Sequence, residues 1–577
     1  DADRYRTGVE TCENYIPTMQ GPLIRRSGTR YVANSKDNAK ARLQRFEYST
    51  SQAYMIEFTN LAIRFHLDNG QLLEAAKTVT AITQASPGVL TSVAHGYSTN
   101  DVVYLSGMGG MTQFNGRLFS VFVLSMDTFK VRELNTGGFV DTSAFSAYTT
   151  NGTAERVYTL VSPYAEAHIP YLQFVQSADV LYIVHPSYAP RKLSRVSATS
   201  WTLSTITFLD GPYLDYSSSA TTLTTSGATA IGASVTVTAS SITGINGDTG
   251  FQTTDVGRYI RLKISATRYT YLLITGRTST TVVTATVGGT AMAADPTTVT
   301  NTLTAGWALG MWSDTTGYPA AIAFHEDRLA LSGAPAAPQA ICLSKVGDYE
   351  NMTPTDYVGV ITDDQAINYT MNLGDVNAVQ WLISGDPGLF AGTASAENII
   401  AASTQGEALT PSNFKAKEIS NYGSSRVQPV KIGGVIFFVQ KSGRVLRELT
   451  YNDSAEKAKA PNRTIIAHHI LRSGVVQMAH QKEPQSLLWC VREDGVLAVM
   501  TYEKEEDSVV VGWHRQILGG VDADGNHAIV ESVAVIPSAD ETTYDVWVSV
   551  KRYVNGGYKR FIEYFEALFD DETEQED

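Results

Sequence analysis

The chain has 577 residues, of which 43% are hydrophobic and 18% charged, and 44 Lys and Arg against 58 Asp and Glu give a net charge of −14 at pH 7. This length exceeds the roughly 50 to 250 residues of an ordinary domain, so we expect several domains or one repeat architecture with insertions. The composition is globular. The acidic charge excludes a protein that grips nucleic acid over its whole surface, because such binding needs clustered cations, but it is compatible with DNA that slides past.

The sequence predicts no membrane anchor. No apolar run approaches the roughly 20 residues of a membrane-spanning helix, and the first residues, DADRYRTG, lack the basic and apolar regions of a signal peptide. Cys12, Cys342 and Cys490 are far apart and odd in number. We therefore expect buried thiols rather than a disulfide framework or a zinc site.

The N-terminal stretch CENYIPTMQGPLIRRSGTRYV, residues 12 to 32, concentrates turn residues and charge. Pro17 and the Gly21-Pro22 pair are expected to bend the chain between two strands, and Gly28 to make a second turn before a propeller strand. Arg25 and Arg26 lie on this connection, where we expect them to pair with acidic side chains of the same chain or of a neighbouring copy. Binding to DNA is the less favoured alternative, because so few cations release few counterions.

Further along, the chain repeats a short apolar strand, a polar turn and a second strand, which is typical of a β protein. The seven units are YMIEFTNLAIRFHLDNG from Tyr54, VLYIVHPSYAPRKLSR from Val180, RLALSGAPAAPQAICLSK from Arg328, LFAGTASAENIIAAS from Leu389, IFFVQKSGRVLRELTY from Ile436, LLWCVREDGVLAVMTY from Leu487 and VWVSVKRYVNGGYKRFIEY from Val546. In the second half they recur about every 50 to 60 residues, close to the roughly 40 to 50 of propeller blades. The repeat predicts a mostly β fold, a β-propeller of about seven blades (six to eight).

Two intervals between these units are too long for one blade and are predicted to hold inserted small β-barrel or sandwich domains. The expected organisation is an N-terminal segment with the first propeller strands (1–76), an inserted domain (77–157), propeller (158–215), a second inserted domain (216–312), propeller blades (313–569) and an acidic tail (570–577). Propeller loops tolerate such insertions because loop closure costs little more as a loop lengthens.

One cluster offers acid–base chemistry: His325, Glu326, Asp327 and Arg328 in FHEDRL. Two carboxylates beside an imidazole can perform general acid–base catalysis when their pKa values differ. The alternative, which we favour, is a turn at the start of a strand in which Arg328 pairs with an acid. The chain lacks a G-x-S-x-G elbow, an H-E-x-x-H helix, a Walker loop and sialidase-type Ser-x-Asp-x-Gly-x-x-Trp boxes, so we expect no enzyme and no cofactor.

Three other motifs favour structural roles. Strand alternation would send His468 and His469 to opposite faces, away from a shared metal. The stretch VDADGNH (521–527) resembles a calcium loop but lacks the EF-hand spacing, so a turn is expected. The glycine-rich SGMGGMTQFNGRLF (106–119) is equally consistent with a partner-binding loop and with packing inside its domain.

The N-terminal stretch resembles the signature of the tail nozzle proteins, or tail tubular protein B-like proteins, of short-tailed bacteriophages. The residues that carry the resemblance are Asn14, Pro17, Gly21, Arg25, Arg26, Gly28, Thr29 and Arg30. The stretch departs from the family at Ser27, where Pro is usual, and it lacks the upstream Gly-Glu-Leu-Ser-Pro segment, so we expect a longer natural N-terminus. The first insertion resembles the small β-domain of ubiquitin-activating enzymes, without their ligase chemistry.

The resemblance implies a virion protein at the distal end of the phage tail. Such a protein forms a homo-oligomeric ring, a hexamer, that binds the tail adaptor and gives tail fibres or spikes a place to dock. Phage double-stranded DNA passes through its lumen during ejection without tight binding. The rival hypothesis is a propeller that binds or cleaves glycans on the host surface, using aromatic side chains and the FHEDRL cluster.

Overall fold

The computed structural model describes residues 8–18, 22–49, 52–150, 152–227, 230–263, 268–288, 306–356, 359–371, 377–404, 406–452, 457–504, 509–539 and 541–568. The expected acidic tail, Gly21 and most of the stretch before Val9 lie outside these ranges. Among the described segments, the helices are short 3-10 turns, none with the length and apolar character of a membrane span. These turns are η1 (Lys36–Asn38), η2 (Thr112–Phe114), η3 (Ile169–Tyr171) and η4 (Thr253–Asp255).

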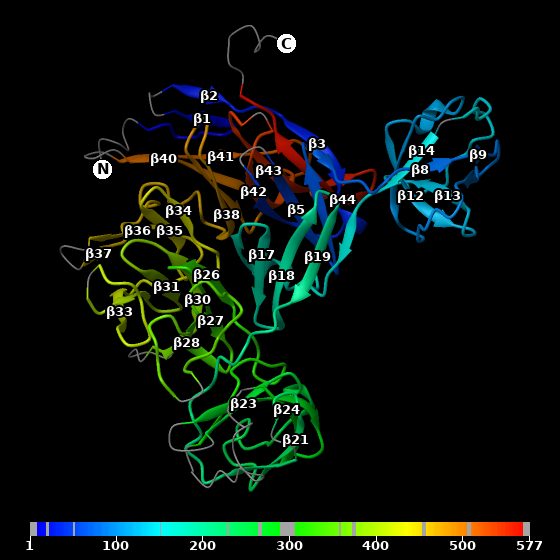
Figure 1. Ribbon diagram of the computed structural model, residues 1–577. Helices are drawn as coiled ribbons and strands as arrows, with labels where there is room; N and C mark the ends of the chain where they lie inside the picture. Colours follow the sequence, from blue (N-terminus) through cyan, green and yellow to red (C-terminus); the bar gives the residue numbers. More distant parts are fainter. Residues whose placement is uncertain are drawn as a thin grey trace.

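Seven antiparallel sheets, six of four strands and one of five, form the blades of a β-propeller in the described residues (Figure 1). Blades 1 to 3 come first in the chain: blade 1 is β4 (Arg42–Glu47), β5 (Ala53–Thr59), β6 (Ala62–Leu67) and β15 (Thr159–Val161), with the short β7 (Gly70–Gln71) paired to β6; blade 2 is β16 (Gln173–Ser177), β17 (Val180–His185), β18 (Tyr188–Ser197) and β19 (Ser200–Thr205); blade 3 is β26 (Ala321–His325), β27 (Arg328–Ala334), β28 (Ala337–Leu343) and β29 (Ile367–Thr370). Blades 4 and 5 follow: blade 4 is β30 (Val379–Ser384), β31 (Leu389–Thr393), β32 (Glu397–Ala402) and β33 (Phe414–Ser420); blade 5 is β34 (Val430–Ile432), β35 (Val435–Val439), β36 (Leu446–Asn452) and β37 (Lys457–Lys459). The last two blades are blade 6, with β38 (Val475–Gln481), β39 (Leu487–Arg492), β40 (Leu497–Lys504) and β41 (Val509–Gln516), and blade 7, with β42 (Ile529–Pro537), β43 (Tyr544–Val554), β44 (Gly557–Phe565) and β3 (Thr29–Asn34). The predicted mostly β propeller of about seven blades is confirmed.

Each of the seven repeated sequence units forms the two central strands of a blade. Several of these strands are buried on both faces because each blade packs between two others; all residues of β27 and of β39 are buried. An apolar cluster joins each blade to the next in the described residues. The cluster between blades 7 and 1, with Leu43, Met55 and Trp547, closes the ring.

The ring is also closed by the chain termini. The N-terminal strand β3 pairs antiparallel with β44 and completes blade 7 from outside, so a strand from the first part of the chain lies beside one from its last part (Figure 1). The residues that precede β3 form a hairpin of β1 (Tyr15–Pro17) and β2 (Leu23–Arg25). The sequence predicted this hairpin, but β3 belongs to the last blade rather than to the first.

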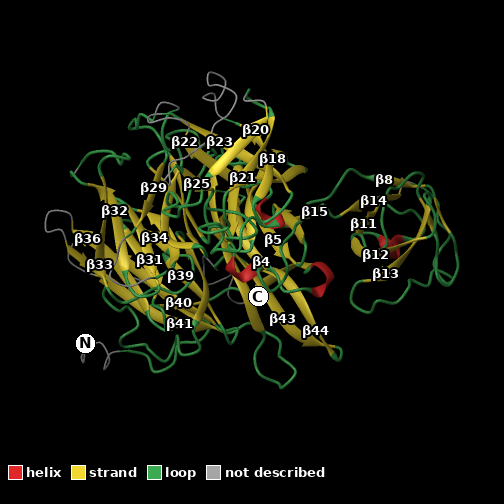
Figure 2. Ribbon diagram, turned by 90° about the horizontal axis from the view of Figure 1, so that it is seen from below, coloured by secondary structure: helices red, strands yellow, loops and turns green. Residues whose placement is uncertain are grey.

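Two small β-domains are inserted in propeller connections and stand apart from the ring (Figure 1), and Figure 2 shows the separation of the first of them from a second side. The strands of the first are β8 (Lys77–Val79), β9 (Ala81–Ile82), β10 (Leu90–Thr91), β11 (Val102–Ser106), β12 (Arg117–Val123), β13 (Thr128–Glu133) and β14 (Gly152–Arg156), and those of the second are β20 (Leu223–Gly227), β21 (Ser234–Ala239), β22 (Tyr259–Lys263), β23 (Tyr269–Arg277), β24 (Val282–Val287) and β25 (Trp307–Leu309). Each sheet surrounds an apolar cluster of its own. Both domains therefore have separate cores.

Candidate functional site

The centre of the propeller is filled by glutamine side chains. The Gln173 side-chain amide of blade 2 donates a 2.7 Å hydrogen bond to the carbonyl of Gln380 at blade 4, and Gln428, before blade 5, donates one of 2.7 Å to Phe174 of blade 2. These bonds connect blades that are not neighbours in the ring. The axis of a single propeller is therefore too narrow for a DNA duplex.

Gln477, in the first strand of blade 6, contacts blades 1 and 7. Its Nε2 donates to the carbonyls of Val533 (2.8 Å) and Leu43 (3.2 Å), and its Oε1 accepts from the Ser532 hydroxyl at 2.7 Å. One side chain of blade 6 thus satisfies polar groups of blades 1 and 7. Its role is structural.

The N-terminal signature binds the outer edge of blade 6. We call the contacts of Glu13, Asn14 and Arg26 with Arg515 and Ile517 the N-terminal clasp. Asn14 adopts a left-handed backbone conformation (φ 61°), which Asn tolerates better than most residues. Its backbone amide donates to the carbonyl of Arg515, and its Oδ1 accepts a 2.8 Å hydrogen bond from the Ile517 amide. Glu13 forms an ion pair with Arg515 over 2.5 Å. The clasp ties the start of the chain to the outer strand β41.

Arg26 completes this clasp. Its Nε donates to Asn14 Oδ1 over 3.0 Å, its Nη2 to the Ile517 carbonyl over 2.8 Å and its Nη1 to the Ser27 carbonyl over 2.7 Å. Burial, and then the charge of Arg25, lowers the pKa of Arg26. Within the chain, Arg26 therefore donates to two carbonyls and an amide oxygen instead of to the expected acidic side chain.

The other signature residues have local roles. Pro17 and Pro22 flank the turn of the β1–β2 hairpin, and the Pro17 carbonyl accepts from the Thr501 hydroxyl at 2.9 Å. Arg25 is exposed, and Arg30, next to Thr29 in β3, pairs with Glu566 over 3.4 Å. The second turn expected at Gly28 is wrong, since the chain runs there into β3 without a turn.

The FHEDRL cluster forms a two-residue β-hairpin turn between β26 and β27. His325 pairs with Arg328, while Glu326 (φ 46°) and Asp327 (φ 54°) are both left-handed, as a type I′ turn requires. A Glu326 carboxylate oxygen accepts a 2.6 Å hydrogen bond from the Leu409 amide. The predicted turn is present.

The two flanking side chains of this turn point into the protein. Arg328 is 1% exposed and donates to the carbonyls of Ser344, Gln365 and Asp363, so the expected pairing with a carboxylate is replaced by backbone contacts. His325 contacts the Ser384 hydroxyl at 3.0 Å, and burial lowers its pKa while Glu326 opposes this. The arrangement holds the hairpin in place.

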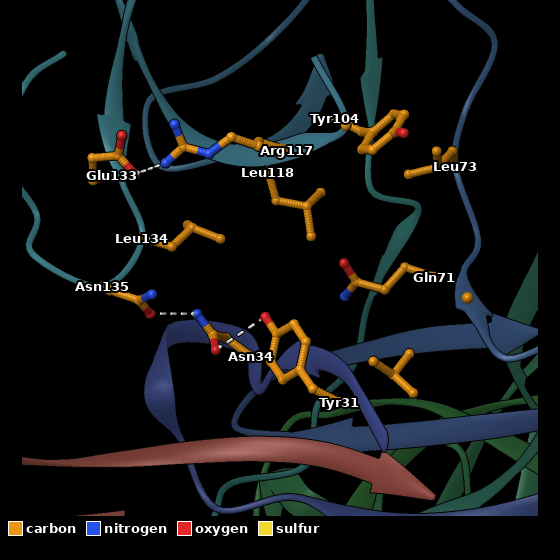
Figure 3. Close-up of a pocket in the computed structure, with 13 residues that line it drawn as sticks. Tyr31, Asn34, Gln71, Leu73, Tyr104, Arg117, Leu118, Glu133, Leu134 and Asn135 are labelled. Carbon is orange, nitrogen blue, oxygen red and sulfur yellow. Dashed lines mark hydrogen bonds and ion pairs between the residues drawn. The ribbon is translucent and has the colours of Figure 1, made fainter. Parts of the chain in front are cut away.

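A cavity of about 460 Å³ lies between the first inserted domain and the propeller (Figure 3). Tyr31 and Asn34 of β3 face Asn135 of the inserted domain across it, and Asn34 Nδ2 contacts Asn135 Oδ1 at 3.3 Å. Arg117 and Glu133 line it but pair with each other over 2.6 Å. The cleft therefore offers amides and a tyrosine rather than an unpaired acid or base.

The inserted domain is carried on a stalk of two paired segments. The amides of Glu74 and Tyr158 donate 2.8 Å hydrogen bonds to the carbonyls of Arg156 and Leu72. Arg156 also forms ion pairs with Glu74 (2.8 Å) and Asp101 (3.1 Å). No local sequence pattern predicts this stalk, because Glu74, Asp101 and Arg156 are distant in sequence.

The remaining predicted motifs are structural. Met108 and Met111 are buried in the first inserted domain, which favours packing over partner binding. Asp522 accepts from the amides of Asp524 and Asn526, as expected of a turn. The residues that the structure describes contain no group of three His, Cys, Asp or Glu side chains suited to a metal.

Two expectations about these motifs are wrong. The adjacent histidines 468 and 469 lie in a run of turns that connects blades 5 and 6, not in a strand, and their ring centroids are 6.0 Å apart. Cys342 and Cys490 are buried free thiols, as predicted, but Cys12 is only half-buried because it lies in the N-terminal clasp at the surface.

One part of the chain matches a known family of domains. Residues 85–158 match the model of the ubiquitin-activating enzyme E1 FCCH domain, as the first insertion was expected to do. This match covers the inserted domain and leaves the propeller outside. No curated protein matches the sequence.

Solved structures similar to this chain include propeller proteins of several functions. The Myceliophthora thermophila Cps50 (Swd1) β-propeller domain is 9% identical, with 52% of this chain and 85% of that chain covered and a TM-score of 0.27. A leech intramolecular trans-sialidase is 9% identical, with 93% of each chain covered and a TM-score of 0.28.

Proposed function

We propose that this protein is a structural component of the tail of a short-tailed bacteriophage, located at the distal end of the virion. Copies of the chain form a homo-oligomeric ring, a hexamer, that attaches to the tail adaptor, docks fibres or spikes and surrounds the DNA exit channel. The observation that carries the proposal is the N-terminal signature, whose Asn14 and Arg26 clasp blade 6.

The closed propeller axis supports a channel between subunits. Gln173 and Gln428 link blades of one chain that are not neighbours in the ring, so a duplex would need a lumen lined by several copies. The net charge of −14 suits such a lumen, because an acidic wall repels phosphate and does not retain DNA.

Mass photometry of the purified protein, together with cryo-EM of the virion, tests this function. We expect an assembly of about six chains and density for the propeller at the end of the tail. A protein that stays monomeric and is absent from purified virions would overturn the proposal.

A further inference from the structure

An apolar groove of about 200 Å³ lies between blades 6 and 7, beside the N-terminal hairpin. Its apolar walls come from the hairpin, from both blades and from the segment that follows β44. The side chains that form them are Ile16, Leu487, Trp489, Val546, Phe565 and Leu568. The first five belong to the core shared by the two blades, and Leu568 packs against that core. An apolar occupant of the groove would therefore extend the hydrophobic core.

Two polar side chains at the groove already have partners. Gln481 Nε2 donates to the Tyr544 carbonyl over 3.1 Å, and its Oε1 accepts from the indole nitrogen of Trp489 over 3.1 Å. The guanidinium of Arg26 donates three hydrogen bonds and lies over the ring of Phe565, 5.6 Å from its centroid. An apolar occupant therefore suits the groove better than a polar one.

The last residues that the structure describes follow the rim of this groove. Residues 566–568 all line it, and the amide of Glu566 donates a 3.0 Å hydrogen bond to the carbonyl of Gly28, directly before β3. The next residue in the sequence, Phe569, is the first one beyond the described residues. Residues 570–577 include six acidic residues and no apolar one. Phe569 is therefore the one apolar side chain that this segment can offer to the groove.

We propose that the side chain of Phe569 fills the groove of its own chain and attaches the end of β44 to the N-terminal hairpin. An apolar cavity of about 150 Å³ holds a benzene ring, so the volume of this groove suits a phenyl group. Phe569 directly follows Leu568, which already lines the groove. A side chain from another molecule would lose translational freedom on binding, whereas Phe569 is already attached.

The inference goes beyond the proposed tail function and does not depend on it. It concerns how a single chain holds its N-terminal hairpin and the end of its last blade together. A protein that proves to be monomeric would remove the tail function and leave this inference standing.

Hydrogen exchange of the full chain, measured by mass spectrometry on the segment 558–568, tests the proposal. We expect this segment to exchange at least about tenfold faster in Phe569→Ala, because the variant loses the burial of an aromatic side chain. Phe569→Leu keeps an apolar side chain and should stay within about threefold of wild type. Circular dichroism reports whether each variant is folded.

Two shortened chains separate Phe569 from the acidic residues that follow it. A chain that ends at Phe569 should exchange like the full chain, and one that ends at Leu568 should exchange like Phe569→Ala. The proposal is overturned if Phe569→Ala exchanges like wild type or if the two shortened chains exchange equally. It is also overturned if the slow exchange of wild type is lost on dilution, since a second copy would then fill the groove.

Discussion

The guanidinium of Arg26 donates a 3.0 Å hydrogen bond to the side-chain oxygen of Asn14, and both residues also bind the backbone of Ile517, about five hundred positions later in the chain. These hydrogen bonds attach the N-terminal segment to the chain directly after β41. The N-terminal segment therefore contributes to the stability of the last two blades.

Arg26→Ala should destabilise the protein by about 1–3 kcal/mol, because the substitution leaves the Ile517 carbonyl and the Asn14 side chain without their donor. Urea unfolding followed by tryptophan fluorescence measures this difference. Arg25→Ala removes the same charge from an exposed neighbour and should stay within about 0.5 kcal/mol of wild type. Equal effects of the two variants would contradict the clasp.

Gln477→Leu should cost about 1–3 kcal/mol, since it leaves buried polar groups of blades 1 and 7 without partners. The adjacent Val476 is 45% exposed on the same strand, so Val476→Ala serves as the control and should have little effect. Thermal unfolding of the two variants compares them directly, and a tolerated Gln477→Leu would show that the axis is not held together by this side chain.

The buried pair of Glu57 and His66 in blade 1 should make stability depend on pH. The His66 nitrogen lies 3.2 Å from the Glu57 carboxylate, and both side chains are fully buried. Burial alone would raise the pKa of Glu57, but the hydrogen bond from His66 and the charge of Arg64 outweigh it, so the pKa is lowered overall.

A carboxyl whose pKa is lower in the folded state than in the unfolded state stabilises the fold above its unfolded pKa, about 4.3. That contribution is lost as the pH falls through the folded pKa. The urea concentration at the midpoint of unfolding of wild type should therefore decrease as the pH is lowered from about 5 to about 3. The decrease should be smaller in Glu57→Gln. At pH 7 this variant should lose about 3–5 kcal/mol. The same steepness in both proteins would argue against the pair.

Asp327→Gly should stabilise the protein slightly, by less than about 1 kcal/mol, because the left-handed φ of 54° costs an L residue about 1–2 kcal/mol and glycine nothing, whereas the greater freedom of glycine in the unfolded chain offsets up to about 1 kcal/mol of this gain. A stabilised variant supports a structural turn. The rival glycan-cleaving function is tested with host polysaccharide, on which Glu326→Gln and Asp327→Asn should behave like wild type. Cleavage by wild type that either variant abolishes would establish the rival.

The propeller and its seven central hairpins could be predicted from sequence because each hairpin is a continuous apolar run with a turn at its middle, such as the unit from Leu487. The outer strands were harder to predict. The strand β33 is half-exposed and carries lysines that alternate with small residues, so no local pattern separates it from a loop. The outer strand of blade 7 comes from residues 29–34, at the other end of the chain.

The candidate sites also include some features that local sequence predicts and others that depend on contacts between distant segments. By itself, the sequence determined the local features: the turn at Glu326–Asp327, the turn at Asp522 and the apolar hairpins, whose chemistry lies within a few residues. Only the tertiary structure decided that Arg26 contacts Ile517, that Gln173 reaches blade 4 and that Asn34 contacts the first inserted domain. These contacts join segments that are far apart in the sequence and that meet only when the ring closes or an inserted domain docks. No periodic pattern along the chain therefore predicts them.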